Sequence, residues 1–404
     1  MKKMRVVLVT DNYDRKMGYL QNNLPMSMGE LGIDMHVITL DLPPYYMFPD
    51  VRKAYDEFSS EKLVPGTTEQ MDGFQLHIVG HRKQLGYVRG VGLKEKIAEL
   101  KPDIVQTMAA ISWIPVDCAV LKRKLGFKLF TASHYTASVF PLATAGLPKY
   151  HPQMIKAFLT RFLHGRWVSW HTERFYGATS DCTDVAVRFF GVEPKKTAQS
   201  ELGVNTSVFY PATTEEDREA SKQIRERFNI SDDEIFVLYT GRFFPEKQPI
   251  VLAHAIAKLQ AMGEPYRAVF MGSGEQKDGI EACDGCTVSP FVPFVELGSY
   301  FRAADIGCWP AAESMSMIDA AACGIPIVIN HTVKATERVE GNGLMYQLMD
   351  VDDLVRVLLE LKDPAVRKKL GDFGAEKIRE NFSWKSLAKQ RIADYEAALN
   401  GTLK

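Results

Sequence analysis

Two positively charged residues follow a glycine in the second half of the chain, within residues 239–248. Gly241 lets the backbone turn close to a ligand. Arg242 follows it directly, and Lys247 stands five residues after Arg242, shortly before Pro249. Because proline favours the first turn of a helix, we expect both cations beside a helix N-terminus, where they can clamp a diphosphate. The alternative is a surface loop with two solvated cations.

A second glycine segment, residues 269–275, also follows an apolar run. Its Gly-Ser-Gly sequence begins at Gly272 and would let the backbone approach a nucleotide. The segment lacks the third glycine and the downstream acidic residue of a dinucleotide fingerprint. A simple turn between a strand and a helix is therefore an equal alternative.

A third segment, residues 309–326, carries two carboxylates near the start of an expected helix. Glu313 lies at the mouth of that helix, and Asp319 lies within its first turns. Such carboxylates can accept hydrogen bonds from sugar hydroxyls, or they can cap the helix and complement its dipole. Free N–H groups at the helix start can hold phosphate oxygens. The residues concerned are Ser314, Met315, Ser316 and Met317.

Apolar strands and amphipathic helices alternate along the whole chain. We expect strands at residues 5–10, 35–39, 76–79, 104–106, 129–132 and 176–178, and again at 236–240, 266–271, 287–291, 306–309, 327–329 and 343–346. Helices are expected between them, including residues 20–31, 249–262, 315–322, 352–361 and 385–399. This alternation indicates parallel sheets covered by helices. Two such series predict an α/β protein with two Rossmann-like, doubly wound domains.

The pattern predicts three parts: residues 1–208 as an N-terminal domain, 209–383 as a C-terminal domain and 384–404 as a closing helix. The polar stretch 209–217, with a proline and a charge run, is the expected linker. In parallel sheets, ligands bind where the carboxyl ends of strands meet helix N-termini. We therefore expect the site in the cleft between the two sheets.

The composition limits the classes of function. Lys and Arg number 49 and Asp and Glu 50, which gives a net charge of −1 and argues against a dedicated nucleic-acid binder. No uncharged apolar run reaches the roughly 18 residues of a membrane span. The six scattered cysteines are typical of reduced, cytoplasmic thiols. Cys283 and Cys286 lack further zinc ligands and are read as a turn, and Asp350 and Asp352 as a helix cap.

The order of these segments resembles the retaining GT-B glycosyltransferases of family 4. That family reads GR-x4-K-G, then G-x-G-P/E, then E-x7-E-A-M-A-C-G-x-P-V-V, and counterparts stand here at residues 241–247, 272–275 and 313–328. The likeness covers nearly the whole chain. Further counterparts are the hinge strand at 199–211, the Pro-Asp strand at 102–105, the strand ending in histidine at 129–135 and the closing helix after Trp384.

The resemblance implies a GT-B fold, in which two domains face each other across a cleft and the last helix crosses back to the first domain. It implies transfer of a sugar from a nucleotide diphosphate sugar, with a UDP-sugar favoured over a GDP- or ADP-sugar. The acceptor would be a hydroxyl of a glycan, a lipid-linked saccharide or a small metabolite, contacted by loops 43–49 and 140–150. The donor is a substrate, so neither a further cofactor nor a metal is expected.

The resemblance also implies roles for single residues. Arg242 and Lys247 would stabilise the charge on the leaving β-phosphate. His134 would bind a donor hydroxyl and orient the transferred sugar; the alternative is a strand-end histidine bonded to the backbone. Asp319 would accept hydrogen bonds from the ribose, and Glu313 would contact the transferred sugar. The remaining donor-binding residues are Gly18 in the first glycine loop, Gly241, Gly272, and Val292 near the base.

Several positions depart from the family pattern. Asp319 stands where the second family glutamate is expected, and the first falls on Ala311, two residues before Glu313. Gln248 replaces the glycine after the lysine, and Gln106 replaces the histidine that ends the Pro-Asp strand. These departures concern the donor-sugar contacts and leave the diphosphate clamp intact. A non-catalytic sugar-nucleotide-binding module and a sugar-nucleotide 2-epimerase are the alternative functions.

Residues 149–170 combine basic and aromatic side chains. One interpretation is an interfacial helix that docks on anionic lipid beside a lipid-linked acceptor. The other is a packed helix between domains, which we favour because each cation contributes only about 1 kcal/mol near a charged membrane. We accordingly expect a cytoplasmic protein, with peripheral contact at the inner face of the membrane as the alternative.

Overall fold

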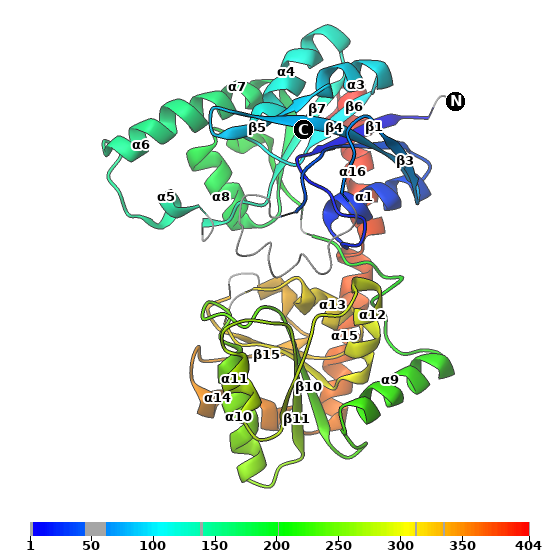
Figure 1. Ribbon diagram of the computed structural model, residues 1–404, viewed down its shortest axis with the longest axis vertical. Coiled ribbons are helices and arrows are strands. Elements are labelled where there is room, and N and C mark those ends of the chain that lie inside the picture. The colour runs from blue at the N-terminus through cyan, green and yellow to red at the C-terminus, as the bar shows by residue number, and fades with distance from the viewer. Residues whose placement is uncertain are drawn as a thin grey trace. The chain divides into compact units, whose positions relative to one another are not determined.

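The computed structural model describes residues 3–44, 62–137, 140–200, 202–311, 313–333 and 336–403. The chain forms two compact units (Figure 1). Unit 1 comprises Met1–Gly203 and Trp384–Lys404, and unit 2 comprises Val204–Ser383. The chain therefore first passes from unit 1 to unit 2 after Gly203. The sequence pattern placed this boundary after residue 208, with a linker at 209–217. The final helix, α16 (Trp384–Leu399), belongs to unit 1.

The sheet of unit 1 has the order β3-β4-β2-β1-β6-β7-β8-β9, with β5 also paired to β4. Only β3 and β5 run antiparallel to their neighbour; the other strands are parallel. The strands are β1 (Arg5–Thr10), β2 (Asp34–Leu40), β3 (Thr68–Met71), β4 (Phe74–Gln84), β5 (Tyr87–Val91), β6 (Ile104–Thr107), β7 (Lys128–Ser133), β8 (Thr172–Gly177) and β9 (Thr197–Gln199). The helices of this unit, besides α16, are α1 (Leu20–Glu30), α3 (Leu93–Leu100), α4 (Trp113–Leu125), α5 (Pro141–Thr144), α6 (Pro152–Ala157), α7 (Leu163–His171) and α8 (Ser180–Phe189).

Polar contacts tie α16 to this sheet. The Asp394 carboxylate accepts hydrogen bonds from Arg174 on β8 at 2.6 Å and from the Tyr176 hydroxyl at 2.8 Å. The Tyr395 hydroxyl donates to the side-chain carbonyl of Gln106 on β6. Gln106 is fully buried. The glutamine that replaces the family histidine therefore serves to anchor the last helix.

The sheet of unit 2 is entirely parallel, in the order β12-β11-β10-β13-β14-β15. Numbered along the unit this is 3-2-1-4-5-6, the order of the doubly wound nucleotide-binding fold. The strands are β10 (Ile235–Thr240), β11 (Tyr266–Met271), β12 (Cys286–Ser289), β13 (Ile306–Trp309), β14 (Ile327–Asn330) and β15 (Gly343–Tyr346). The helices are α9 (Glu215–Arg227), α10 (Pro249–Ala261), α11 (Lys277–Glu281), α12 (Phe294–Ala303), α13 (Ser316–Ala322), α14 (Val351–Glu360) and α15 (Pro364–Asn381). The α/β prediction with two doubly wound sheets is confirmed.

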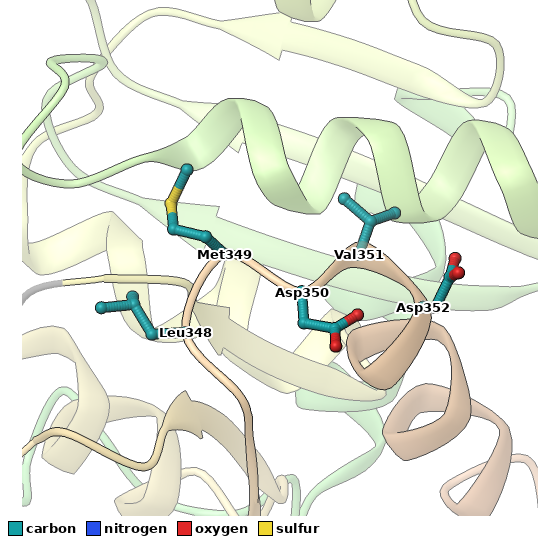
Figure 2. A pocket seen from close by; sticks show the side chains of 5 residues that line it. All are labelled: Leu348, Met349, Asp350, Val351 and Asp352. Atoms are coloured by element: carbon teal, nitrogen blue, oxygen red, sulfur yellow. The ribbon is translucent and has the colours of Figure 1, made fainter.

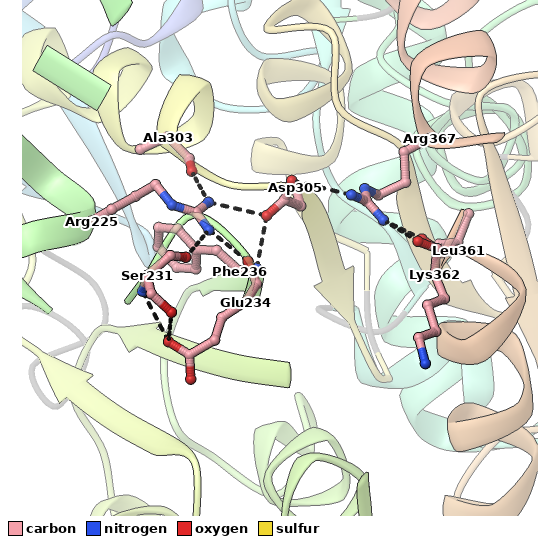
Figure 3. A network of polar contacts seen from close by, with 9 residues as sticks. All are labelled: Arg225, Ser231, Glu234, Phe236, Ala303, Asp305, Leu361, Lys362 and Arg367. Carbon is pink, nitrogen blue, oxygen red and sulfur yellow. Dashed lines mark hydrogen bonds and ion pairs between the residues drawn. The ribbon is translucent and has the colours of Figure 1, made fainter. Parts of the chain in front are cut away.

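Asp305, between α12 and β13, contacts three other elements of unit 2 (Figure 3). Its carboxylate accepts hydrogen bonds from Arg225 of α9 at 3.1 Å and from the Phe236 N–H of β10 at 2.8 Å, and lies 3.7 Å from Arg367 of α15. Arg225 also donates to the backbone carbonyls of Ala303, Ser231 and Glu234. This network fixes the amino ends of β10 and β13, the two strands at the centre of the sheet.

The charge run that opens α9 does more than face solvent. Thr214 and Asp217 form a reciprocal capping box, in which each side chain accepts from the backbone N–H of the other. Asp217 is buried and also accepts from the Tyr210 hydroxyl at 3.1 Å.

Among the described residues, no helix combines the length and the apolar character that crossing a bilayer requires.

Candidate functional site

The loops after β10 and β13 meet at the centre of unit 2. These strands are neighbours, and the chain leaves them toward opposite edges of the sheet, to β11 and β14 respectively. Such a point, at the carboxyl ends of the strands, is where doubly wound sheets bind ligands. The loop after β11 lies beside the loop after β10. All three segments with predicted chemistry thus belong to one end of one sheet.

Lys247 connects two of these loops. Its ammonium group donates to the backbone carbonyl of Glu313 at 2.6 Å. Burial lowers the pKa of Lys247, and the neighbouring Arg242 lowers it further. An ammonium group has three N–H donors, and only this one is engaged within the described part of the chain. Lys247 can therefore hold the loop and still offer donors to an anion.

Arg242 is held less tightly than Lys247. Its guanidinium lies 3.4 Å from the Glu246 carboxylate and 5.5 Å from the centroid of the Phe244 ring. Its backbone carbonyl accepts from the Tyr239 hydroxyl at 2.9 Å. The backbone of the loop is thus fixed. Among the described residues, the guanidinium has the exposed Glu246 carboxylate as its one ion-pair partner, so it can turn to a ligand.

The glycines of the first two loops pack against each other. A side chain at Gly272 would place its Cβ 1.9 Å from the carbonyl oxygen of Gly241, and one at Gly274 would come within 2.6 Å of the Phe243 carbonyl. The Phe243 N–H donates to the Ser273 carbonyl at 2.9 Å. Close contact between the two loops thus explains both glycines of the second loop without a ligand. Gly241 and Gly272 act here through the backbone.

Gln248 adopts a backbone conformation that favours glycine. Its φ of 47° and ψ of 43° lie in the left-handed region, and it forms the N-cap of α10 without a side-chain hydrogen bond. The Ile250 N–H is capped from the second loop instead, by the Gln276 side chain at 3.4 Å. Glycine, which the family pattern has at this position, adopts this conformation without a clash of Cβ with the backbone. Glutamine destabilises the folded loop here by about 1 kcal/mol.

Arg338 is the residue at this site that sequence reasoning missed. It lies in a short 3-10 helix (Thr336–Arg338) after β14 and is almost fully buried. Its guanidinium donates to the Ser314 carbonyl at 3.2 Å and lies 3.8 Å from the Glu313 carboxylate. No glycine loop or repeated motif precedes it, so the sequence offered no signal. It adds a third cation beside Arg242 and Lys247.

Glu313 and Asp319 differ in their surroundings. The Glu313 carboxylate is partly exposed and faces Arg338. Asp319 lies in α13 with 8% of its surface exposed, and burial raises its pKa to about 8 against the opposing effect of Arg338. The role expected for Asp319, accepting hydrogen bonds from the ribose, suits an ionised carboxylate. Burial instead keeps this carboxyl group largely protonated at neutral pH.

The start of α13 has some of its N–H groups already bonded. The Ser316 N–H donates to the Ser314 hydroxyl at 3.3 Å, and the Met317 N–H donates to the Ser314 carbonyl at 3.3 Å. Met317 is fully buried, whereas Met315 is only partly buried. The structure therefore places Ser314 and Met315 nearer the surface of this predicted phosphate site than Met317.

The other acidic and cysteine motifs of unit 2 form a helix cap, an ion pair and a turn. Asp350 caps α14 by accepting from the Asp353 N–H at 3.0 Å, and Asp352 pairs with Lys258 of α10. Figure 2 shows both carboxylates lining a shallow hollow at the start of α14. The capping interpretation is confirmed for Asp350. Cys286 begins β12 after a turn in which its N–H donates to the Cys283 carbonyl, so that turn is confirmed too.

Three predicted residues belong to other segments of the chain than these loops. Val292 is partly buried between β12 and α12 and packs against the core of unit 2. His134 and Gly18 belong to unit 1, where they follow β7 and β1. Burial lowers the pKa of His134 to about 4, with a further contribution from Arg391 of α16, so its imidazole is neutral at pH 7. Of the expected acceptor loop 43–49, residues 45–49 lie outside the described residues.

Residues 234–363, which carry the sheet of unit 2, match the family model described as glycosyl transferases group 1. A D-inositol 3-phosphate glycosyltransferase of Streptomyces bingchenggensis is 28% identical over 251 residues, which cover 57% of this chain and 54% of that protein. An MMP alpha-(1->4)-mannosyltransferase of Mycolicibacterium hassiacum is 29% identical over 223 residues, covering 52% and 50%. The chain thus spans about half the length of the curated relatives it matches.

Solved structures resemble the chain over nearly its whole length. Sucrose-phosphate synthase from Thermosynechococcus elongatus aligns with a TM-score of 0.71 at 16% identity, covering 99% of this chain and 100% of that one. Anabaena HepE in complex with UDP and glucose aligns with a TM-score of 0.65 at 13% identity, covering 98% and 100%. These neighbours have the GT-B fold, and the predicted fold class is confirmed.

Proposed function

We propose that this chain, whose residues 234–363 match the group 1 glycosyltransferases, transfers a sugar from a nucleotide diphosphate sugar to an acceptor hydroxyl with retention of the anomeric configuration. The matched curated relatives are glycosyltransferases by name, and HepE has been solved with UDP and glucose and with UDP-glucose. A UDP-sugar is therefore the favoured donor, ahead of a GDP- or ADP-sugar. The acceptor is a glycan, a lipid-linked saccharide or a small metabolite.

The cation cluster at the centre of unit 2 carries this proposal. Arg242 and Lys247 come from the loop after β10, and Lys247 contacts the loop after β13 at 2.6 Å. Arg338 reaches the same loop from after β14. Three cations at the carboxyl edge of a doubly wound sheet suit the two negative phosphates of a donor. Placed before the reaction, such groups stabilise charge without having to reorganise.

The reaction breaks the bond between the anomeric carbon and the β-phosphate oxygen and forms a bond from that carbon to the acceptor oxygen. Negative charge grows on the leaving phosphate, where Arg242 and Lys247 stabilise it. The leaving phosphate takes the acceptor proton on the same face of the sugar, so no side chain is assigned as a general base. His134, neutral at pH 7, orients the transferred sugar, Glu313 contacts that sugar, and Asp319 binds the ribose.

Turnover of a donor panel tests the proposal. The full chain is incubated with UDP-, GDP- and ADP-sugars, and slow release of free sugar is followed by NMR, which also reports the anomer. We expect release of the retained anomer from one donor class. Arg242→Ala and Lys247→Ala should each lower kcat by about 10²-fold or more, as for other lost transition-state donors.

A lysine on α10, the helix that follows the Lys247 loop, provides the matched control. Lys258 is half-exposed and pairs with Asp352, away from the loop after β13. Lys258→Ala should therefore leave kcat unchanged. Near-normal turnover in both Arg242→Ala and Lys247→Ala would refute the clamp. Tight nucleotide binding without turnover would indicate a non-catalytic binding module, and a donor sugar inverted at C2 would indicate an epimerase.

A further inference from the structure

One long stretch of unit 1 contains no acidic residue. Between Asp117 and Glu173 the chain carries eight lysines and arginines and neither aspartate nor glutamate, although the whole chain has a net charge of −1. The stretch runs from α4 through α7. Three of these cations pair with glutamates outside the stretch: Lys122 and Lys128 with Glu173, and Arg166 with Glu193. Cations of the stretch that remain unpaired on the surface favour an anionic partner.

The helical run from Pro152 to His171 dominates this stretch (Figure 1). It consists of α6, a π-helical segment (Phe158–Phe162) and α7. One side of the run is buried: the residues there are Ala157, Gly165, Val168 and Ser169. This buried side attaches the helix to unit 1.

The opposite side of this run exposes large apolar side chains. Ile155, Leu159 and Leu163 recur at intervals of four and are 47%, 53% and 45% exposed. Phe158 is 48% exposed, and Trp170 near the end of α7 is 63% exposed. Scattered single exposures are ordinary, but a contiguous apolar stripe on one helix marks an interaction site. We call this set of five side chains the α6–α7 stripe. The helical run is thus packed on one side and exposed on the other.

Basic side chains border the α6–α7 stripe at both ends. Lys149 and Lys156 are exposed, and neither forms an ion pair within the described part of the chain. At the other end, the ammonium of Lys122 donates to the His171 carbonyl at 2.6 Å, and that of Lys196 to the Ser169 carbonyl at 2.7 Å. Lys122 also pairs with the Glu173 carboxylate at 2.8 Å, so the exposed Trp170 indole lies near both cations and a carboxylate. Among the described residues, the exposed cations of this face without an ion pair are Lys149 and Lys156. Tryptophan and lysine in this arrangement are typical of helices at membrane–water interfaces.

Charge decides which partner fits this face. A second copy of the chain, paired about a twofold axis, would bring the same basic surface against itself, and like charges oppose that contact. An anionic bilayer complements it, since its headgroups neutralise the cations while its acyl region accepts the apolar stripe.

We propose that the α6–α7 stripe docks on the surface of an anionic lipid bilayer, with the helix lying in the headgroup region and Lys149 and Lys156 contacting lipid phosphates. The proposal does not depend on the glycosyl-transfer reaction, since vesicle binding is measured without a donor. It is compatible with a lipid-linked acceptor but does not require one.

Co-sedimentation with vesicles tests this docking. We expect the full chain to bind vesicles of phosphatidylcholine and phosphatidylglycerol in equal parts, to bind pure phosphatidylcholine vesicles far more weakly, and to lose binding as salt screens the charges. Each cation contributes about fivefold near a charged bilayer, so K149Q combined with K156Q should weaken partitioning by about 25-fold. L159Q combined with L163Q should weaken it by about 100-fold, taking about tenfold for each apolar side chain.

Matched controls lie in unit 2. Val295 and Lys368 are strongly exposed, so V295S and K368Q should bind vesicles like the unaltered chain. All variants should keep the far-UV circular dichroism and the slow donor hydrolysis of the unaltered chain, which separates loss of docking from loss of folding or of the catalytic function.

Three results would overturn the proposal. The first is absence of binding to the anionic vesicles. The second is equal binding by the unaltered chain and both double variants. The third is a dimer that forms without vesicles and that L159Q with L163Q dissociates, because it would assign the α6–α7 stripe to a second copy of the chain.

Discussion

Replacing Asp319 by asparagine should stabilise unit 2, and the gain should grow with pH. Burial raises the pKa of Asp319 to about 8, and Arg338 only partly opposes that shift. The unfolded chain releases the same proton near pH 4. Between these values the unfolded state has lost a proton that the folded state still holds, so folding stability falls as pH rises through this window. Asparagine resembles the protonated carboxyl group and is free of this penalty.

The magnitude follows from proton linkage. Each pH unit inside the window changes the free energy of unfolding by about 1.4 kcal/mol per proton. From pH 5 to pH 7, the stability difference between Asp319→Asn and the unaltered chain should therefore grow by roughly 2.7 kcal/mol. Above a pH of about 8 the folded protein also releases the proton, and the difference should level off.

Urea unfolding of unit 2 measures this effect. Trp309 is the single tryptophan of Val204–Ser383 and is fully buried. A 5-fluorotryptophan label therefore gives unit 2 its own ¹⁹F NMR signal. Asp352→Asn, at an exposed carboxylate on α14, serves as the control and should leave the pH slope unchanged. A stability difference for Asp319→Asn that stays constant between pH 5 and pH 7 would refute the buried, protonated carboxyl.

Two further perturbations test other buried charges. His77→Gln should reduce the acid sensitivity of unit 1, because burial lowers the pKa of His77 to about 4. The unaltered chain should therefore lose up to about 3 kcal/mol of folding stability as pH falls from 6.5 to 4. An equal loss in the variant, measured by the urea midpoint, would contradict this. Asp305→Ala should lower the stability of unit 2 by about 3 kcal/mol, because it leaves the largely buried Arg225 without its carboxylate partner. A urea midpoint, followed by the Trp309 signal, that stays within error of the unaltered chain would show that the network contributes little.

The parallel core strands were predictable because they are continuous apolar runs. All six residues of β10 are buried, as are five of the six in β1, and buried parallel strands have this signature. The polar edge was not predictable in the same way. Strand β3 alternates between exposed and half-buried residues, and β5 pairs with β4 through a turn at Leu85 and Gly86, both with positive φ. The sequence analysis therefore omitted β3 and β5.

The predicted site residues of unit 2 follow from a local rule, and the missed one does not. Arg242, Lys247 and Glu313 each lie in a loop that follows an apolar strand, and the carboxyl ends of parallel strands share one edge. Arg338 reaches that edge from a 3-10 helix with no pattern of its own. Its place depends on pairing between distant strands, which no short stretch of sequence encodes. The glutamine at position 106 was likewise unexplained until Tyr395 of α16 was seen to donate to it.

The centre of unit 2 departs from the packing that stability alone would favour. Lys247 and Arg338 both bind carbonyls of residues 313–314, and Arg242 further lowers the pKa of Lys247. Gln248 holds a left-handed conformation beside them, and Asp319 is buried without a neutralising ion pair among the described residues. Mutual repulsion of the cations, a strained residue and a buried acid each cost stability. Since native sequences tolerate such conflicts chiefly at functional sites, their coincidence at one switch point supports this cluster as the anion site: binding of a diphosphate would relieve the repulsion between the cations.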